Sequence, residues 1–248
     1  MHTKFMIRPY KLGSKSAKDL AIAMGKILGY KVWRLKPNSI PRRNTIVINW
    51  GNGVPYWRAT HDLNSKTEKA TNKLLTFKAF SEEGVFCPEW TQDKSVAQKW
   101  INSGKFVVAR KILTGNSGKG IVLCHKDGNP LPNAPLYTLY KPKRHEYRAH
   151  VVKGQVIGVV QKKKKKGVEA DTKIRNHGHG WIFCRDNIIV PYDLHAVAIS
   201  AVCACDLDFG AVDIIWNEKE NRCYALEVNT APGIEGTTVL QYAKAFAQ

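Results

Sequence analysis

The chain has 248 residues, of which 44% are hydrophobic and 24% are charged. This length and composition suit a globular enzyme with a buried core, and they exclude a disordered or fibrous protein. The sequence contains no apolar run of the roughly 18 residues that a membrane span requires, and Met1–Arg8 lacks the apolar stretch of a signal peptide. We therefore expect a cytoplasmic protein without membrane contact.

The formal net charge of +19 is extreme for a chain of this size. It predicts an acidic partner, which is a nucleic acid, an acidic polypeptide or a strongly anionic small molecule. The six cysteines are dispersed and form no CxxC pair, which argues against a disulfide framework or a zinc site.

The N-terminal part predicts a small α/β domain. Apolar residues recur at helical spacing from Ala17 to Leu28, after a helix start at Ser14 and before a stop at Gly29. Strands are expected at Lys4–Pro9, Tyr30–Leu35 and Thr45–Asn49. A strand–helix–strand order of this kind favours a parallel sheet.

The rest of the chain predicts a sheet-rich α+β body. Helices are expected at Asn64–Glu82, Ser95–Asn102, Tyr192–Cys205 and Val239–Ala247. Strands are expected at Phe106–Lys111, Gly120–His125, Leu136–Tyr140, Tyr147–Val152, Gln155–Lys162, Phe209–Trp216 and Cys223–Asn229. The last two strands are separated by a polar turn and predict a hairpin.

Two acidic residues interrupt the apolar strands of this hairpin. Placing Trp216 opposite Tyr224 sets Asp213 directly opposite Glu227, and Asn229 shares a face with Glu227. Two facing carboxylates repel each other unless a cation lies between them. Two carboxylates and an amide oxygen are ligands that Mg²⁺ prefers, so we expect a metal site here. The alternative is that each acid only faces solvent.

A glycine-rich loop, Thr114–Gly120, joins two of the expected strands. Its small residues would let backbone N–H groups approach phosphate oxygens, although it lacks the Walker pattern and such hairpin loops are common. Arg110 and Lys111 precede it on opposite faces of a strand, so one of them should point at whatever the loop covers.

Glu146, Arg148 and His150 share one face of another strand. This row is either a surface salt-bridge row or a site in which Arg148 meets a phosphate or a developing oxyanion. The run Lys162–Lys166 is expected to be a solvated loop or a landing patch for a polyanion, with Lys162 nearest the strand and able to reach inward. His177 and His179, in a glycine loop, favour exposed side chains over a metal site.

Asp213, followed by Glu227-Val-Asn229 and then Pro232-Gly233, resembles the C-terminal signature of the ATP-grasp superfamily. Within it the sequence is most similar to the carboxylate–amine ligases, which include ribosomal-protein glutamate ligases and phage-encoded members. The similarity extends from about Lys73 to Gln248. It implies a pre-ATP-grasp domain over residues 1–72 and an ATP-grasp domain over 73–248, divided near residue 140 into two subdomains.

The resemblance also implies roles for individual residues. Phosphate contacts are expected from Arg110, or less favourably Lys111, and from Gly115, Ser117, Gly118 and Gly120 of the closing loop. Leu139, Tyr140 and Lys141 resemble the hinge that meets adenine, and Glu146 the acid that meets ribose. Arg148 and Asn176, together with Lys162, are the expected catalytic contacts. Asp213, Glu227 and Asn229 match the ligands of one or two Mg²⁺ ions, with Mn²⁺ as an alternative. Arg110 departs from the usual Lys, and the acidic hinge residue is missing.

The implied reaction joins a carboxylate to an amine through an acyl-phosphate, with release of ADP and phosphate. A phage-encoded enzyme of this kind would act in the host cytosol. The charge leaves two other interpretations open: a nucleic-acid or polyanion-binding protein, and a ligase whose substrate is an acidic peptide, a protein or a nucleic acid.

Overall fold

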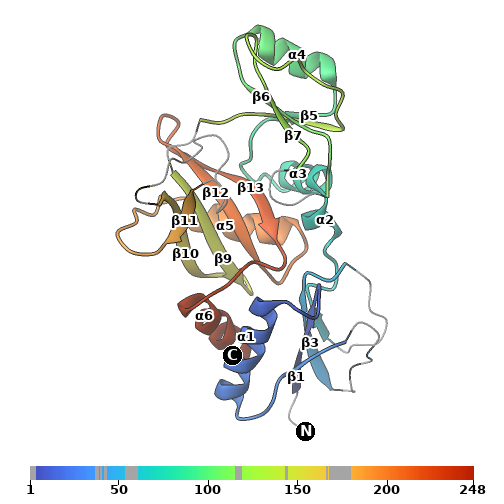
Figure 1. Ribbon diagram of the computed structural model, residues 1–248, viewed down its shortest axis with the longest axis vertical. Coiled ribbons are helices and arrows are strands. Elements are labelled where there is room, and N and C mark those ends of the chain that lie inside the picture. The colour runs from blue at the N-terminus through green and yellow to red at the C-terminus, as the bar shows by residue number, and fades with distance from the viewer. Residues whose placement is uncertain are drawn as a thin grey trace.

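The computed structural model describes residues 4–36, 39, 41, 44–53, 61–114, 119–142, 145–165, 167 and 180–248. Three β-sheets follow one another along the long axis of the molecule (Figure 1). The N-terminal sheet lies at one end, a five-stranded sheet lies in the middle, and a small sheet with its own helix lies at the other end. The mixed α+β class predicted from the sequence is confirmed.

The N-terminal sheet is parallel and has the order β2-β1-β3-β4. Its strands are β1 (Lys4–Pro9), β2 (Trp33–Arg34), β3 (Thr45–Trp50) and β4 (His61–Leu63). Helix α1 (Lys15–Leu28) begins after Ser14, whose side chain accepts a hydrogen bond from the Ala17 N–H, and ends at Gly29 in the left-handed conformation. The predicted parallel sheet and both ends of this helix are confirmed, whereas β2 is shorter than expected and β4 was not expected.

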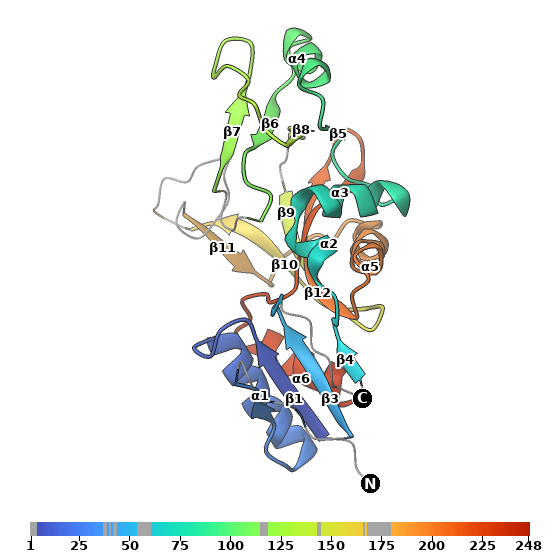
Figure 2. The ribbon, with the colours of Figure 1, turned by 90° about the vertical axis from the view of Figure 1, so that its right-hand side faces the viewer.

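The last helix of the chain lies against the first. Helix α6 (Thr237–Ala247) packs on α1, as both ribbon views show (Figures 1 and 2). Their shared core also takes in Trp50 of β3 and Phe209, whose rings stack at 5.5 Å, and the ring of Tyr242 meets Trp50 edge-on at 5.4 Å. The N-terminal sheet is thus covered on this face by residues from both ends of the chain.

The helix expected over Asn64–Glu82 is wrong as a single element. The structure has α2 (Glu68–Thr71) and α3 (Lys73–Glu82), separated by Asn72 in an extended conformation. The Asn72 side chain accepts hydrogen bonds from Leu74 N–H and Leu75 N–H, so it caps α3. Because an asparagine side chain bonds the backbone ahead of it better at a helix start than inside a helix, the element divides there.

The small sheet is antiparallel and has the order β5-β8-β6-β7, with α4 (Lys94–Asn102) packed on it. Its strands are β5 (Trp90–Thr91), β6 (Val107–Arg110), β7 (Ile121–Cys124) and β8 (Leu136–Leu139). Val107 and Ala109 of β6 face the core that this sheet shares with α4, so Val108 and Arg110 face the other side.

The central sheet is antiparallel and has the order β11-β10-β9-β12-β13. Its strands are β9 (His145–Val152), β10 (Gln155–Lys164), β11 (Trp181–Cys184), β12 (Phe209–Asn217) and β13 (Arg222–Asn229). Helix α5 (Leu194–Ala204) covers one face and forms the largest hydrophobic core with it. Strand β11 was not expected. The loop expected over Lys162–Lys166 is wrong in part, because β10 continues past Lys162 to Lys164 and these residues pair with β11.

The register of the β12–β13 hairpin differs from the prediction at one end. Trp216 pairs with Cys223 rather than Tyr224, because a β-bulge shifts the register between Asp213 and Ile214. Beyond the bulge, Asp213 pairs with Glu227 as predicted. The bulge therefore sets which side chains meet at the carboxylate end of the hairpin.

All six cysteines are free, as expected. None of the helices in the described part of the chain combines the length and the hydrophobicity needed to cross a lipid bilayer.

Asn64 fastens the segment after β4 to the central sheet, and its substitution should be costly. Its side-chain oxygen accepts hydrogen bonds from Asp208 N–H and Phe209 N–H, and its amide donates to the Phe209 carbonyl. The side chain is fully buried, so Asn64→Ala strands these backbone groups and should lower the free energy of unfolding by about 2–4 kcal/mol.

Urea unfolding of Asn64→Ala measures this loss, and Asn187→Ala is the matched control. Both asparagines have positive φ, 58° at Asn64 and 52° at Asn187, but Asn187 is exposed. The control removes the same backbone preference without the buried hydrogen bonds. Equal losses in the two variants would contradict the bonding role.

Candidate functional site

A row of charged side chains crosses the face of the central sheet that α5 does not cover. On β9, Tyr147 and Ala149 enter the α5 core, so Glu146 and Arg148 lie on the opposite face, as their alternation predicted. Arg148 pairs across the sheet with Asp213 of β12, which in turn pairs with Glu227 of β13. Three neighbouring strands thus bring these side chains into one line.

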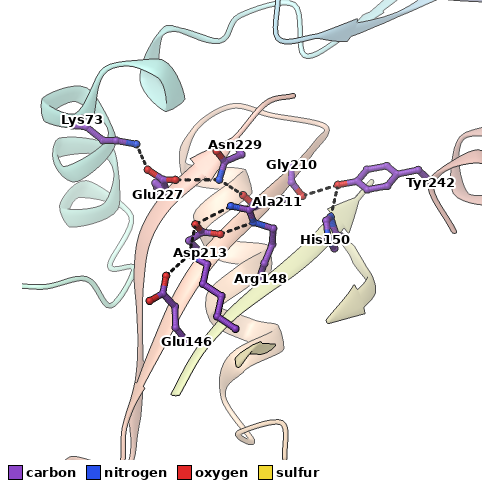
Figure 3. Close-up of polar contacts among 11 residues, drawn as sticks. Lys73, Glu146, Arg148, His150, Gly210, Ala211, Asp213, Glu227, Asn229 and Tyr242 are labelled. Carbon is purple, nitrogen blue, oxygen red and sulfur yellow. Dashed lines mark hydrogen bonds and ion pairs between the residues drawn. The ribbon is translucent and has the colours of Figure 1, made fainter. Parts of the chain in front are cut away.

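Asp213 lies at the middle of this row and is bound on both carboxylate oxygens (Figure 3). Arg148 donates from Nε to Oδ1 at 2.6 Å and from Nη2 to Oδ2 at 3.0 Å, a bidentate arrangement. Lys162 of β10 approaches Oδ2 at 3.4 Å and also forms an ion pair with Glu146. The inward orientation predicted for Lys162 is confirmed.

Glu227 lies beside Asp213 and is bound by a residue from outside the sheet. Lys73, the first residue of α3, places its ammonium 2.5 Å from Glu227 Oε2 (Figure 3). The Asn229 amide donates to Glu227 Oε1 and to the Ala211 carbonyl, each at 3.3 Å. Sequence reasoning missed Lys73, since a lysine at a helix start carries no signal of a partner 154 positions away.

The charges of this cluster shift its ionisation in opposing directions. Burial raises the pKa of Asp213, but Arg148 and Lys162 outweigh it and hold that pKa below its usual range. Burial also raises the pKa of Glu227, and Lys73 outweighs this effect too. Burial lowers the pKa of Lys162, but Asp213 and Glu146 have the larger, opposite effect, so the net shift is upward and the ammonium stays charged. The carboxylates of Asp213 and Glu227 are therefore held in ionised form by the cations beside them.

Phe183 of β11 closes the outer end of the row. Its ring lies 4.7 Å from the Arg148 guanidinium carbon and 5.6 Å from the Lys162 ammonium. A cation this close to an aromatic face is attracted by the ring. The ring is 46% exposed, so it also forms an apolar edge where the site meets solvent. Sequence reasoning missed this contact because β11 itself was not expected.

Arg110, rather than Lys111, faces the central sheet. It lies on the side of β6 away from the small-sheet core, whereas Lys111 is exposed. Burial lowers the pKa of Arg110, and the negative charge of Glu227 opposes this shift. The two side chains therefore interact electrostatically, one from each sheet. The Arg110 Nε is buried and has no hydrogen-bond acceptor among the described residues. A buried guanidinium donor of this kind is suited to an anionic ligand.

His150 is buried at the inner end of the row, where its Nδ1 lies 3.1 Å from the Tyr242 hydroxyl. Burial lowers the pKa of His150 to about 3, and the charges of Arg148 and Arg185 add to the shift. The unfolded chain takes up a proton below about pH 6.5 and the folded chain does not, so acid favours unfolding. Between about pH 6.5 and 3, this group should reduce stability by up to about 1.4 kcal/mol per pH unit.

Unfolding free energies at pH 7 and pH 5 test this prediction. His150→Gln removes the titration, so its stability should fall less between the two pH values than that of the unmodified chain. His195→Gln, at an exposed histidine, is the control and should leave the pH dependence unchanged. The same pH dependence in His150→Gln and the unmodified chain would refute the assignment.

Comparison with solved structures identifies the architecture. No protein-family model matches the chain, and no curated protein matches it. Its structure is similar to that of the ATP-grasp ligase PsnB in complex with a minimal precursor, with a TM-score of 0.72 at 10% identity over 99% of this chain and 98% of that one. A RimK domain ATP-grasp protein from Sphaerobacter thermophilus gives 0.66 at 13% identity, over 98% of each chain. D-alanine–D-alanine ligase from Bacillus anthracis gives 0.61 at 13% identity, over 99% of this chain and 92% of that one.

The chain has the ATP-grasp fold. The fold predicted from the carboxylate hairpin is confirmed, and the similarity covers the N-terminal sheet as well as the two parts after it. In this ATP-grasp fold the small sheet supplies Arg110 and the central sheet supplies the charged row.

Several predicted contacts fall outside the described part of the ATP-grasp fold. Gly115, Ser117, Gly118 and Asn176, as well as His177 and His179, lie outside the described residues. Gly120 is described and has φ of 73°, and a Cβ there would lie 2.8 Å from Ile112, so only glycine fits this position without a shift.

The expected hinge lies between β8 of the small sheet and β9 of the central sheet. Leu139 N–H donates to the Glu89 carbonyl and Tyr140 N–H to the Phe106 carbonyl. A ligand at the hinge would therefore have to use carbonyl groups or Lys141. The Lys141 ammonium is engaged in ion pairs with Glu89 at 3.2 Å and Glu220 at 3.3 Å.

The chemistry of the hairpin fits a divalent metal. Asp213, Glu227 and Asn229 offer oxygen ligands from paired positions of two strands, since Ala211 pairs with Asn229 and Asp213 with Glu227. The Asn229 amide nitrogen is already donating, so its oxygen is the atom that would meet a metal. Among the described residues, no group of three His, Cys, Asp or Glu side chains forms a metal cluster, so the amide is needed to complete the set.

Proposed function

We propose that the chain is an ATP-dependent ligase that joins a carboxylate to an amine, with Mg²⁺ as the metal. The observation that carries this proposal is the meeting of Asp213, Glu227 and Asn229 with Arg148 and Lys162 on one sheet face, opposite the buried Arg110 donor. Oxygen ligands beside the positive charges of Arg148, Lys162 and Arg110 suit a metal that carries nucleotide phosphates.

The ligands and peptides found in the similar structures support the same reaction class. PsnB has been solved with Mg and ADP, and with the precursor peptide PsnA2 and AMPPNP. A ligase from Chryseobacterium gregarium has been solved with ADP and with leader and core peptides. The macrocyclase MdnC from Microcystis aeruginosa has been solved with its precursor peptide MdnA. A peptide is therefore the substrate class that these relatives favour for this chain.

The reaction needs no side-chain nucleophile. A substrate carboxylate attacks the γ-phosphate of ATP and gives an acyl-phosphate and ADP, after which an amine attacks the acyl carbon and phosphate leaves. Positioning and charge neutralisation supply most of the rate in reactions of this kind. Mg²⁺, when bound, offsets the negative charge on the phosphates.

The residues of the chain divide this work between the two subdomains. Arg110 would bind phosphate from the small sheet, and Asp213, Glu227 and Asn229 would hold the metal on the central sheet. Arg148 and Lys162 stabilise negative charge that develops at the reacting carboxylate, and Glu146 keeps Lys162 in position through its ion pair. Lys73 forms an ion pair with Glu227, one of the carboxylates that would hold the metal.

Phosphate release from Mg-ATP tests the proposal. The purified chain is screened against pairs of carboxylates and amines, including acidic peptides and their amine partners. Release that requires both members of a pair supports ligation. ATP hydrolysis that no pair accelerates would contradict it, and so would a complete lack of nucleotide binding.

A further inference from the structure

The positive charge of the chain is concentrated in its N-terminal domain. Residues 1–63, up to the end of β4, contain twelve Lys or Arg residues and only two acids, Asp19 and Asp62. Asp19 is already paired, with Lys15 at 2.8 Å. The charged row of the central sheet, by contrast, contains equal numbers of acids and cations. The proposed ligase site therefore leaves the excess charge of the N-terminal domain unexplained.

Exposed aromatic rings accompany these cations along one edge of the N-terminal sheet. Trp33 of the edge strand β2 is 56% exposed, and Tyr10, directly after β1, is 51% exposed. The Lys31 ammonium lies 3.8 Å from the Trp33 ring, and the Lys11 ammonium lies 5.3 Å from the Tyr10 ring. Each ring therefore has a lysine beside it.

The two rings belong to neighbouring strands, since Trp33 lies on β2 and Tyr10 directly follows β1. Trp33 pairs with Met6 of β1, four residues before Tyr10, which corresponds to about 13 Å along the strand direction. Between them Arg34 donates to the Leu12 carbonyl at 2.8 Å, which fixes the loop after β1 to β2. We name these residues the basic aromatic edge; its members are Tyr10, Lys11, Lys31, Trp33, Arg34 and Lys36.

We propose that the basic aromatic edge binds single-stranded nucleic acid, as a second activity beside the proposed ligation. Cations alone would bind any polyanion, including an acidic peptide. Exposed aromatic rings beside cations also provide stacking surfaces, and the flat bases of a nucleic acid can stack on them. The edge strand offers no deep groove, so the binding would follow the backbone and tolerate many sequences.

The loop after β1 projects to the same side of the molecule as β10 and β11 in Figure 2. None of the residues of the basic aromatic edge belongs to the proposed ligase site.

Fluorescence anisotropy of a labelled single-stranded oligonucleotide of twelve nucleotides tests the proposal. The full chain is titrated without ATP, at salt concentrations from 50 to 200 mM. Replacing Lys11, Lys31 and Lys36 together by Gln should make the slope of log affinity against log salt shallower by about 2, because each phosphate contact contributes about 0.7 on single strands. Trp33→Leu should weaken binding by about tenfold, the loss expected of one stacked base.

Two matched controls separate this edge from general charge and general hydrophobicity. Replacing Lys99, Lys105 and Lys126 by Gln removes the same charge from exposed positions of the small-sheet lobe, at the other end of the molecule (Figure 1). Tyr192→Leu removes a ring that is 79% exposed on the central part. Both controls should keep most of the affinity. Loss of affinity equal to that of the edge variants would overturn the proposal, as would an absence of binding.

A competition arm distinguishes nucleic acid from an acidic polypeptide. Polyglutamate at the same charge concentration should displace the oligonucleotide poorly, and Trp33→Leu should not change its effect. Equal or better displacement by polyglutamate would show an acidic polypeptide to be the partner and would overturn the proposal. Ligase turnover in the edge variants should match the unmodified chain, so failure of the edge and failure of the ligase are separate results.

Discussion

Glu227→Gln is expected to reduce ATP-dependent turnover by about a thousandfold. The substitution keeps the size and one oxygen of the side chain but removes the charge that would hold the metal beside Asp213. Metal stabilisation of phosphate charge contributes several kcal/mol, and each 1.4 kcal/mol is a factor of ten in rate. The measurement is ADP formation over a range of Mg²⁺ concentrations.

The Mg²⁺ dependence makes this prediction specific. Glutamine retains a weak oxygen ligand, so raising Mg²⁺ should recover part of the lost rate in Glu227→Gln. Glu235→Gln, at an exposed position near α6, is the control and should behave as the unmodified chain. Near-normal turnover of Glu227→Gln at low Mg²⁺ would contradict the metal assignment.

Glu227 is a better test than Asp213 because of the way each carboxylate is bound. Asp213 is 5% exposed and engages both Arg148 and Lys162. Its replacement by Ala would leave two buried cations without their partner, and breaking a buried ion pair in this way typically costs about 3–5 kcal/mol. Loss of activity in such a variant would mix unfolding with loss of the metal.

Arg148→Lys should lower turnover by about 10²- to 10³-fold while the chain stays folded. Lysine keeps the positive charge, so Asp213 retains a cation beside its carboxylate. It cannot reproduce the two parallel N–H donors that meet Asp213 at 2.6 and 3.0 Å, nor the flat contact with Phe183. A single misplaced donor at a developing oxyanion accounts for a loss of this size.

Separate measurement of kcat and KM for ATP checks the role of Arg148. A contact made in the transition state affects kcat, whereas a contact made equally with bound ATP affects KM. Arg222→Lys is the matched control, because Arg222 also lies over an aromatic ring, Phe86, at 4.2 Å, but on the far strand of the hairpin. A normal kcat in Arg148→Lys would remove Arg148 from the reaction.

The parts of the fold that sequence reasoning anticipated are those with strong local patterns. Helix α1 has apolar spacing between a serine cap and a glycine stop, and the β12–β13 hairpin has two apolar strands around a polar turn. The helix break at Asn72 and the short strand β11 were missed because a few residues decide them and the tertiary context stabilises them. Strand β11 exists because β10 continues far enough to pair with it.

The candidate site divides in the same way. Alternation along β9 was enough to place Glu146 and Arg148 on one face, and alternation along β13 did the same for Glu227 and Asn229. That the two sets share one sheet face follows from the pairing of β9 with β12. The contact of Lys73 with Glu227 depends on how α3 packs against the central sheet, which no local pattern encodes. The bulge after Asp213 is also a property of two strands together, and it happened to preserve the predicted pair of carboxylates.

The packing of α6 on α1 has a consequence for how the polypeptide matures. Ile7, Met24 and Trp50 near the start of the chain share a hydrophobic cluster with Tyr242 and Phe246 near its end. A nascent chain leaving the ribosome must therefore carry this apolar surface uncovered until α6 has been synthesised, and contacts so distant in sequence form slowly. Synthesis in the cell should leave this protein dependent on chaperones until its final helix docks.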